Sequence, residues 1–357
     1  MAAALALARK GEGQTRPNPP VGAVLVKRGA VVGDGYHHRA GAAHAEVLAI
    51  RKAGDAARDA TLYVTLEPCS TFGRTPPCTD LVRSSGIARV VVGVPDPNPK
   101  HVGRGLRILR RAGIAVDTGI LADEAANLIR PFAKWVTTRR PMLTLKLGMT
   151  LDGRIADGAG RSRWITSGAA RDAVDDLRSR ADAIMVGAGT ACADDPALLC
   201  RRRSRRGAFR VIVDSTGRLP LDARVLNDEH RHMTIIATTR RCPARRLAAY
   251  RNCGAAVWVL PAKGGRVSLR RLMTALGRQG LLHAVCEGGG ELACSLIADR
   301  LVDEFLFFLA PRIMGGGKSV PAVGGEGWPL RATPWLRFEE IRREGPDLMI
   351  RAAPAPA

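Results

Sequence analysis

Short apolar runs alternate with helical segments along the whole chain, and this alternation is the feature that most restricts its fold. Strands predicted at residues 61–67 and 88–94 flank a helix predicted at 78–86, and the alternation continues to about residue 120. Residues 21–36 hold two β-branched runs around a Lys-Arg-Gly turn, which predicts a hairpin. Strands that alternate with helices favour a mainly parallel sheet covered on both faces. The sequence therefore predicts an α/β protein.

A domain boundary is predicted near Pro141. A polar, basic helix at about 121–138 leads into Arg139-Arg140-Pro141, and a proline there favours a break. With 357 residues, 46% of them hydrophobic, the chain can form two cores. We therefore expect two domains, residues 1–139 and 140–357. Strand candidates in the second are at 142–149, 183–189, 209–215, 233–239, 256–262, 282–289 and 303–311.

Cysteine usage and the apolar segments indicate a cellular compartment. Eight cysteines in 357 residues are too few for a disulfide scaffold, and MAAALALARK lacks the basic leader and cleavage context of a secretory signal. No apolar run approaches the roughly twenty residues that span a bilayer. We expect a cytoplasmic protein that does not bind membranes.

The formal net charge of +22 raises the possibility of a nucleic-acid partner. The arginines are spread along the chain, however, and only 4% of residues are aromatic, which leaves few surfaces for base stacking. The one dense basic cluster is at 201–206, and we interpret it as a solvated loop rather than a polyanion site.

Three potential metal ligands and a carboxylate follow one another in a pattern typical of a catalytic zinc site. His44 and Glu46 open a helix predicted at 43–54, and Cys69 and Cys78 each follow a proline. A catalytic zinc takes three protein ligands and leaves one position for water. Cys69 is expected near a helix N-terminus, where the helix dipole favours the thiolate. Two ordinary buried thiols are the alternative.

Glu46 need not touch the metal to take part in catalysis. A carboxylate beside activated water can accept its proton and pass it to a leaving amine. His-x-Glu followed by Pro-Cys and a second Cys is the signature of zinc deaminases, although here eight residues separate the cysteines instead of two. An exposed helix glutamate is the alternative for Glu46 alone. The four residues together predict a hydrolytic deaminase.

Glycines at two predicted strand ends suggest phosphate contacts in the second domain. Such junctions let backbone N–H groups approach a phosphate at a helix N-terminus. Neither matches the dinucleotide fingerprint, and tight turns would explain both as well. The residues are Gly187, Gly189 and Thr190 in the first, and Gly288, Gly289 and Gly290 in the second.

Longer motifs carry a resemblance to a known family. RPNPPVGAVLV, GYHHRAGAAHAEVLAI, YVTLEPCSTFGRTPPC and VPDPNP resemble the deaminase half of the bifunctional riboflavin-biosynthesis deaminase/reductase family. KLGMTLDGRIA, WITS, GTACADDPAL, VIVDSTGRLP, CEGGGELA and LVDEFLFFLAP resemble its reductase half. The eight-residue spacing of the cysteines is the spacing of that family. Thr71 departs from it, because the family usually has histidine at this position.

The resemblance implies a fold, two activities and their cofactors. It implies an N-terminal cytidine-deaminase-like three-layer α/β/α domain and a C-terminal dihydrofolate-reductase-like α/β domain. The first would deaminate diaminohydroxyphosphoribosylaminopyrimidine with Zn²⁺, and the second would reduce the ribosyl side chain of the product to ribityl with NADPH. The implied partners are small phosphoribosylated pyrimidines rather than nucleic acid, with a homo-oligomer formed through the reductase domain.

The resemblance also implies roles for individual residues. Zinc ligands are His44, Cys69 and Cys78, with Glu46 catalytic. Contacts to the deaminase substrate are Asn18 and His37 at the pyrimidine, and Arg74, Asp96 and Asn98 at the ribose phosphate. Contacts to the reductase substrate are Lys146, Trp164, Ser167, Asp194, Arg201 and Glu287. Contacts to NADPH are Thr166, Gly187, Gly189, Thr190, Asp214, Ser215, Gly288, Gly289 and Gly290.

Several of these roles have plain alternatives. Lys146 could be a strand lysine, Asp194 a helix cap, and Glu287 a structural acceptor. Two other functions also remain open. A nucleic-acid deaminase would suit the charge but leaves the second half of the chain unexplained, and a binding protein with structural zinc conflicts with the intact Glu46.

Overall fold

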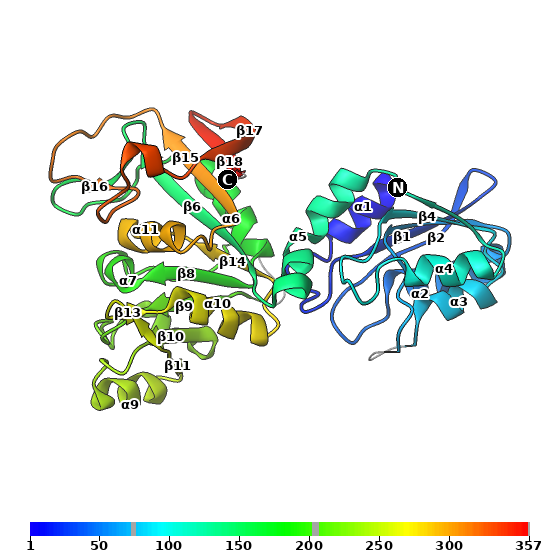
Figure 1. Ribbon diagram of the computed structural model, residues 1–357, viewed down its shortest axis with the longest axis horizontal. Helices are drawn as coiled ribbons and strands as arrows, with labels where there is room; N and C mark the ends of the chain where they lie inside the picture. The colour runs from blue at the N-terminus through cyan, green and yellow to red at the C-terminus, as the bar shows by residue number, and fades with distance from the viewer. Residues whose placement is uncertain (73–75, 202–206, 356–357) are drawn as a thin grey trace. The chain divides into compact units, whose positions relative to one another are not determined.

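The computed structural model describes residues 1–72, 76–201 and 207–355, and the chain divides into two compact units, Met1–Arg139 and Arg140–Ala357 (Figure 1). Arg74 and most of the basic cluster at 201–206 lie outside the described residues. Among the helices that are described, none has the length and apolar character needed to cross a bilayer.

The first unit is built on a five-stranded sheet, in the order β2-β1-β3-β4-β5, within its described residues. β1 pairs antiparallel with both β2 and β3, whereas β3, β4 and β5 are parallel. The hairpin predicted at 21–36 is confirmed, but it makes this sheet mixed rather than mainly parallel. The strands are β1 (Gly22–Lys27), β2 (Ala30–Tyr36), β3 (Thr61–Leu66), β4 (Arg89–Val94) and β5 (Ala115–Thr118).

Helices cover both faces of this sheet. α2 packs on β1 and β2 and contacts α3, which contacts α4, whereas α1 and α5 contact each other and lie on β1 and β4 respectively (Figure 1). The helices are α1 (Ala2–Arg9), α2 (Ala45–Ala53), α3 (Cys78–Ser84), α4 (Arg104–Arg111) and α5 (Ala122–Thr138), with a 3-10 turn, η1, at Gly54–Ala57. The result is the predicted three-layer α/β/α arrangement.

α1 was not predicted, and its position depends on a glycine. A Cβ atom at Gly22 would lie 2.0 Å from the carbonyl oxygen of Ala4, so only glycine in β1 lets this helix come so close to the sheet. Ala4, Leu5 and Ala8 of α1 are buried there. The apolar N-terminal segment is therefore part of the folded unit.

The second unit contains a nine-stranded sheet, in the order β11-β10-β9-β8-β14-β6-β15-β18-β17, within its described residues. Every pairing from β11 to β15 is parallel, and β18 and β17 add an antiparallel edge. Its strands are β6 (Met142–Thr150), β8 (Ala183–Gly187), β9 (Phe209–Val213), β10 (Thr234–Thr238), β11 (Ala256–Val259), β14 (His283–Cys286), β15 (Glu304–Ala310), β17 (Leu336–Glu344) and β18 (Asp347–Pro354). All seven predicted strands are confirmed.

Shorter elements surround this sheet. Two small ladders pair β7 (Arg154–Ala156) with β16 (Val320–Pro321) and β12 (Ala262–Lys263) with β13 (Arg266–Val267). The helices are α6 (Gly168–Arg180), α7 (Ala188–Asp194), α8 (Arg224–Asn227), α9 (Ala244–Asn252), α10 (Leu269–Arg278) and α11 (Gly290–Ala298), with 3-10 turns η2 (Arg231–Met233) and η3 (Leu330–Ala332).

The pleat of the strands divides the core of the second unit between the two faces of the sheet. Along β8, Met185 packs in one apolar cluster while Ile184 and Val186 pack in the other. α10 and α11 close the first cluster, and α6 and α9 close the second. Because the central strands are parallel, the loops that follow β8, β9 and β14 lie at one edge of the sheet, where such sheets bind ligands.

Candidate active sites

Three ligand atoms converge in the first unit. His44 precedes the first residue of α2, Cys78 begins α3, and Cys69 lies in the loop after β3. His44 Nδ1 lies 3.2 Å from Cys78 Sγ and 3.5 Å from Cys69 Sγ, and the three atoms all lie within 4.8 Å of one another. The backbone N–H of Cys78 donates to Cys69 Sγ at 3.3 Å, so this sulfur lies at the N-terminus of α3.

The geometry and the charges of this cluster fit zinc. Zinc bonds of about 2.3 Å to sulfur and about 2.0 Å to nitrogen, at tetrahedral angles, place the ligand atoms about 3.5 Å apart. The pKa of the Cys69 thiol is lowered to about 4, because Cys78 and then His44 donate hydrogen bonds to its sulfur. The pKa of Cys78 is raised, because its thiol donates to Cys69 and is buried. A divalent cation would stabilise both thiolates together.

Glu46 lies beside these ligands, in the first turn of α2, and is 4% exposed. Burial first, and then the charge of Cys69, raise the pKa of this carboxyl to about 7, although His44 opposes the shift. A buried carboxyl group that exchanges its proton near neutral pH suits proton transfer between water and an amine. The alternative of an exposed helix glutamate is therefore wrong.

Asn18 and His37 contact each other next to the metal cluster. The Asn18 amide donates to His37 Nε2 at 3.0 Å, and His37 Nδ1 donates to the carbonyl oxygen of Ala43 at 3.2 Å. The His37 ring meets the ring of His44 edge-on at 5.2 Å. Burial lowers the pKa of His37, which favours a neutral ring. The two residues expected at the pyrimidine thus contact each other, and His37 also packs against the metal ligand His44.

The loop after β4 carries the other two described residues expected to contact the deaminase substrate. Asp96 Oδ1 accepts the N–H of Asn98 at 2.8 Å, and Asn98 Oδ1 accepts the N–H of Lys100 at 3.1 Å. These side chains therefore build consecutive turns at the end of β4. Burial raises the pKa of Asp96.

A cavity of about 2140 Å³ lies in the second unit. It is lined by most of the residues predicted for the reductase. Those on the wall are Lys146, Trp164, Thr166, Gly187, Gly189, Thr190, Asp194, Arg201, Ser215, Glu287, Gly288, Gly289 and Gly290. Both glycine-bearing strand ends meet here, and a Cβ atom at Gly289 would lie 3.0 Å from Thr190 Oγ1. The two glycine-bearing segments therefore lie against each other in this part of the cavity.

Two residues predicted to contact ligands make structural hydrogen bonds to the backbone and are not among the described residues that line the cavity. Ser167 caps α6 by accepting the N–H of Ala170, at 3.3 Å. Asp214 is buried, and its two carboxylate oxygens accept the backbone N–H groups of Gly217 and Leu219 at 3.0 and 2.8 Å. Asp214 shapes the turn that carries Ser215.

Lys146 lies within β6, and Asp194 is the last residue of α7. Burial lowers the pKa of Lys146, and the nearby Glu287 carboxylate opposes this shift. Asp194 does not cap a helix N-terminus, so that alternative is wrong; its Oδ1 accepts the hydroxyl proton of Ser162 at 2.8 Å.

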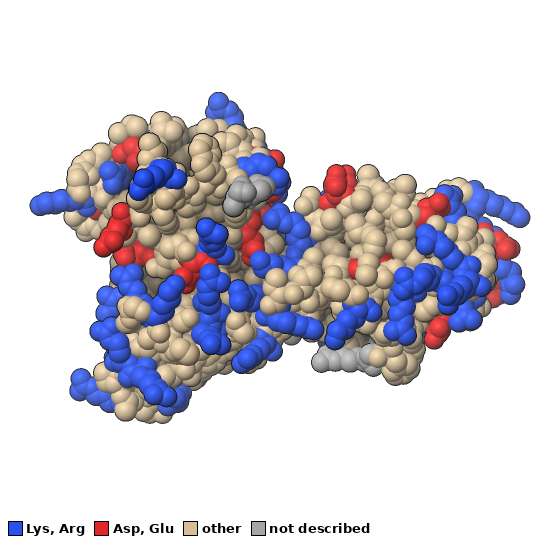
Figure 2. All heavy atoms as spheres, in the orientation of Figure 1, with Lys and Arg blue, Asp and Glu red and all other residues tan. Residues whose placement is uncertain are grey.

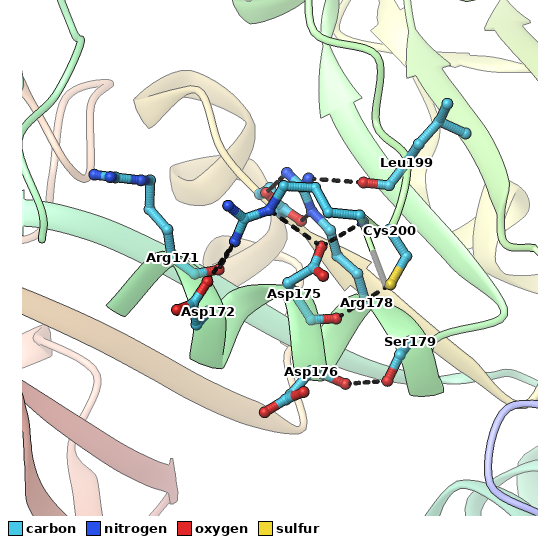
Figure 3. A network of polar contacts seen from close by, with 10 residues as sticks. Arg171, Asp172, Asp175, Asp176, Arg178, Ser179, Leu199 and Cys200 are labelled. Atoms are coloured by element: carbon cyan, nitrogen blue, oxygen red, sulfur yellow. Dashed lines mark hydrogen bonds and ion pairs between the residues drawn. The ribbon is translucent and has the colours of Figure 1, made fainter. Parts of the chain in front are cut away.

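Glu287 is held by an arginine that sequence reasoning did not identify. Arg178 of α6 donates from Nε and Nη2 to the two carboxylate oxygens of Glu287, at 2.5 and 2.7 Å. Its Nη1 donates to the carbonyl oxygen of Leu199 at 3.1 Å (Figure 3). Burial would raise the pKa of Glu287, but Arg178 outweighs it and holds the pKa below its usual value. The pair joins residues 109 positions apart, so no local pattern could have indicated it.

The same helix also holds Arg201. The backbone N–H of Arg201 donates to Asp175 Oδ1 at 2.7 Å, and its Nη2 donates to Asp172 Oδ1 at 2.8 Å. The Arg201 side chain is still 60% exposed. The ion pair with Asp172 is exposed and contributes little, whereas Arg201 Nε also lies 3.7 Å from Oδ1 of the buried Asp175.

We expect Arg178→Met to lower the free energy of unfolding of the second unit by about 3 kcal/mol, because it leaves the buried Glu287 carboxylate without its partner. Arg180→Met is the matched control, since Arg180 is exposed on the same helix. Urea unfolding followed by tryptophan fluorescence measures the effect, because four of the five tryptophans lie in 140–357. Equal stability of the two variants would contradict it.

Comparison with known proteins identifies the family. Residues 1–94 match the model of the cytidine and deoxycytidylate deaminase zinc-binding region, and residues 141–350 match the model of the RibD C-terminal domain. The riboflavin biosynthesis protein RibD of Aquifex aeolicus is 42% identical over 351 residues, which are 98% of this chain and 96% of the relative. The chain belongs to the RibD family. RibD of Escherichia coli is 40% identical over 98% of this chain and 97% of its own.

Solved structures of RibD proteins share the whole fold. RibD of Acinetobacter baumannii superposes with a TM-score of 0.89 at 34% identity, covering 99% of this chain and 98% of its own. A Thermotoga maritima protein, described as a diaminohydroxyphosphoribosylaminopyrimidine deaminase and 5-amino-6-(5-phosphoribosylamino)uracil reductase, has a TM-score of 0.88 at 34% identity, covering 99% and 97%.

Membership of the RibD family confirms the fold class and the general function expected from the sequence. The chain is a deaminase and reductase of riboflavin biosynthesis, with a zinc-binding deaminase domain and a reductase domain that uses NADPH.

Proposed function

We propose that the first unit hydrolyses diaminohydroxyphosphoribosylaminopyrimidine to aminophosphoribosylaminouracil and ammonia, and that the second unit reduces the ribosyl chain of this product to ribityl. The observation that carries the first step is the convergence of His44, Cys69 and Cys78 beside the buried Glu46. The test is ammonia release and NADPH oxidation by the purified, zinc-loaded chain.

Each residue of the deaminase site has one task in this proposal. His44, Cys69 and Cys78 would hold the zinc, which would supply Lewis-acid activation of a water molecule. Glu46 accepts a proton from the attacking water and returns one to the leaving amine, which its raised pKa supports. Asn18 and His37 orient the pyrimidine ring.

The ribose phosphate of the deaminase substrate is assigned to the loop after β4. Asp96 and Asn98 at the turns of this loop would hold it, together with Arg74. The fixed turn geometry of the two described residues supports the assignment.

In the reductase site, the glycines after β8 and β14 would hold the phosphates of NADPH, which would supply the hydride. Lys146 places a cation beside the nitrogen of the opened ribosylamine, and Asp194 orders the sugar hydroxyls. Arg201 binds the substrate phosphate. Glu287, held by two hydrogen bonds from Arg178, acts as a fixed counter-charge near Lys146 rather than as a mobile acid.

The partners in this proposal are small phosphoribosylated pyrimidines in the cytoplasm, and the chain forms a homo-oligomer through the reductase domain. On the face in Figure 2, Lys and Arg side chains are spread over both units rather than collected in one stripe. Several basic side chains of the described residues pair with carboxylates, as Arg89 does with Asp117 at 2.6 Å. This distribution favours a small-molecule enzyme over a nucleic-acid deaminase.

We expect one zinc per chain, and loss of that zinc in the Cys69→Ala, Cys78→Ala double variant, because imidazole alone cannot replace two thiolates. Occupancy should also fall as the pH drops, since the ligands must lose protons to bind. Elemental analysis after desalting measures the metal. The matched control is Cys192→Ala, Cys253→Ala, which removes two thiols outside the cluster. Stoichiometric zinc in the Cys69→Ala, Cys78→Ala variant would show that these two cysteines are not the zinc ligands.

A further inference from the structure

Glu67 is a buried carboxylate to which the mechanism above gives no task. It follows the last residue of β3 and stands two positions before the metal ligand Cys69. The residue is only 5% exposed. Burial of a carboxylate is costly unless hydrogen bonds satisfy it, so its partners indicate what it is for.

The partners of Glu67 are four backbone N–H groups. Its Oε2 accepts from Asp96 at 3.0 Å and from Gly103 at 2.9 Å. Its Oε1 accepts from Gly105 at 2.8 Å and from Leu106 at 3.4 Å, in the first turn of α4. One carboxylate oxygen therefore binds both ends of the segment 96–103, and the other binds the start of the helix that follows.

These bonds fix the segment firmly. Hydrogen bonds to an ionised acceptor are stronger than neutral ones, and the N-terminus of a helix attracts negative charge. Gly105 adds a steric requirement, because a Cβ atom there would lie 2.3 Å from the carbonyl oxygen of Pro68. The start of α4 thus lies directly against Glu67 and Pro68, the two residues that precede Cys69 in the chain.

We propose that Glu67 is a positioning residue of the deaminase, which holds the segment 96–103 at a fixed distance from the zinc ligand Cys69. This inference rests on the proposed function, in which the ring binds at the metal and the ribose phosphate binds at Asp96 and Asn98. A substrate that binds at both places needs the distance between them to be fixed before it binds. Glu67 fixes this distance, because it is hydrogen-bonded to the segment 96–103 and lies two residues before Cys69.

The test is Glu67→Gln in the full-length, zinc-loaded chain. Glutamine has the same size, but its NH₂ group cannot accept a hydrogen bond from an N–H, so two of the four N–H groups lose their acceptor. We expect KM for ammonia release to rise at least about tenfold, with kcat within about threefold. Zinc should stay at one per chain, and reduction of the deaminated intermediate should be unchanged. Glu124→Gln, an exposed acid of the same unit, is the control.

Amide hydrogen exchange provides a second measurement. Exchange at 96–106 should become faster in Glu67→Gln, while exchange in β1 and β3 stays the same. If the glutamine variant does not fold, Glu67→Asp replaces it, because the shorter carboxylate cannot reach all four donors.

The outcomes separate this inference from the proposed function. Unchanged KM and unchanged exchange at 96–106 would overturn it, and so would a fall in kcat alone or loss of zinc, since each would give Glu67 a role in chemistry or metal binding. If the wild-type chain released no ammonia, the proposed function would fail, and hydrogen exchange would still decide whether Glu67 holds this segment.

Discussion

Glu46→Gln is expected to lower the rate of ammonia release by about 10²–10⁴-fold, the contribution typical of a general acid–base group. Glutamine preserves the size of the side chain but cannot carry the proton. Zinc should remain at one per chain, since His44, Cys69 and Cys78 are untouched. NADPH-dependent reduction of the deaminated intermediate should continue at the wild-type rate, because that site belongs to the second unit.

The matched control for Glu46 is Asp55→Asn, an exposed carboxylate that lies just after the same helix. Ammonia release, zinc content and reductase rate should all be measured on the same preparations. Native ammonia release in Glu46→Gln would remove this residue from the mechanism. Loss of zinc together with activity would instead assign it to metal binding.

Lys146→Met and Asp194→Asn are each expected to lower the reductase rate by about a hundredfold or more, with NADPH affinity nearly unchanged. Both residues line the cavity but lie outside the glycine-bearing loops. Methionine suits the half-buried site of Lys146, and asparagine keeps the oxygen that accepts from Ser162, so both variants should stay folded. The measurements are reductase rate, NADPH affinity and melting temperature.

Asp195→Asn is the control for Asp194. Asp195 is the next carboxylate along the chain, accepts the N–H of Arg224 at 2.8 Å and is not among the described residues that line the cavity. Its reductase rate should be close to that of the wild type. Native-like rates in both Lys146→Met and Asp194→Asn would indicate that the sugar binds elsewhere in the cavity, near Glu287 and the glycines 288–290.

The metal centre could be predicted from the sequence because its chemistry is encoded locally. His44 and Glu46 are two residues apart on one helix turn, and each cysteine follows a proline at a strand end or a helix start. The strands with continuous apolar runs were predictable for the same reason, since burial on both faces of a parallel sheet leaves a clear signal.

Elements with a weak apolar signal could not be predicted. β17 reads Leu-Arg-Phe-Glu-Glu-Ile-Arg-Arg-Glu, and most of its side chains are exposed at the edge of the sheet, so it shows no alternation. The segment MAAALALARK, which contains α1, was interpreted from the sequence only as a segment without the features of a secretion signal. Its helix depends on packing against β1, where Gly22 permits the contact.

Pairings between residues far apart in the chain also could not be predicted from the sequence. Arg178 has no motif around it, and its role depends on the ion pair with Glu287. Ser167 and Asp214 stand in motifs that resemble the family, but the sequence did not show that their side chains also accept hydrogen bonds from backbone N–H groups. A motif indicates which segment forms a site, but it does not say which side chains of that segment face the ligand.

If one chain carries out both steps in sequence, the amounts of ammonia released and of NADPH oxidised are linked, and their ratio can be measured. Purified zinc-loaded protein would be given the diaminopyrimidine substrate and NADPH, and both quantities would be followed in time. We expect ammonia to appear first and NADPH oxidation to follow, to a final ratio of one. Removal of zinc should stop both. Oxidation of NADPH by the diaminopyrimidine without ammonia release would contradict this order of the two steps.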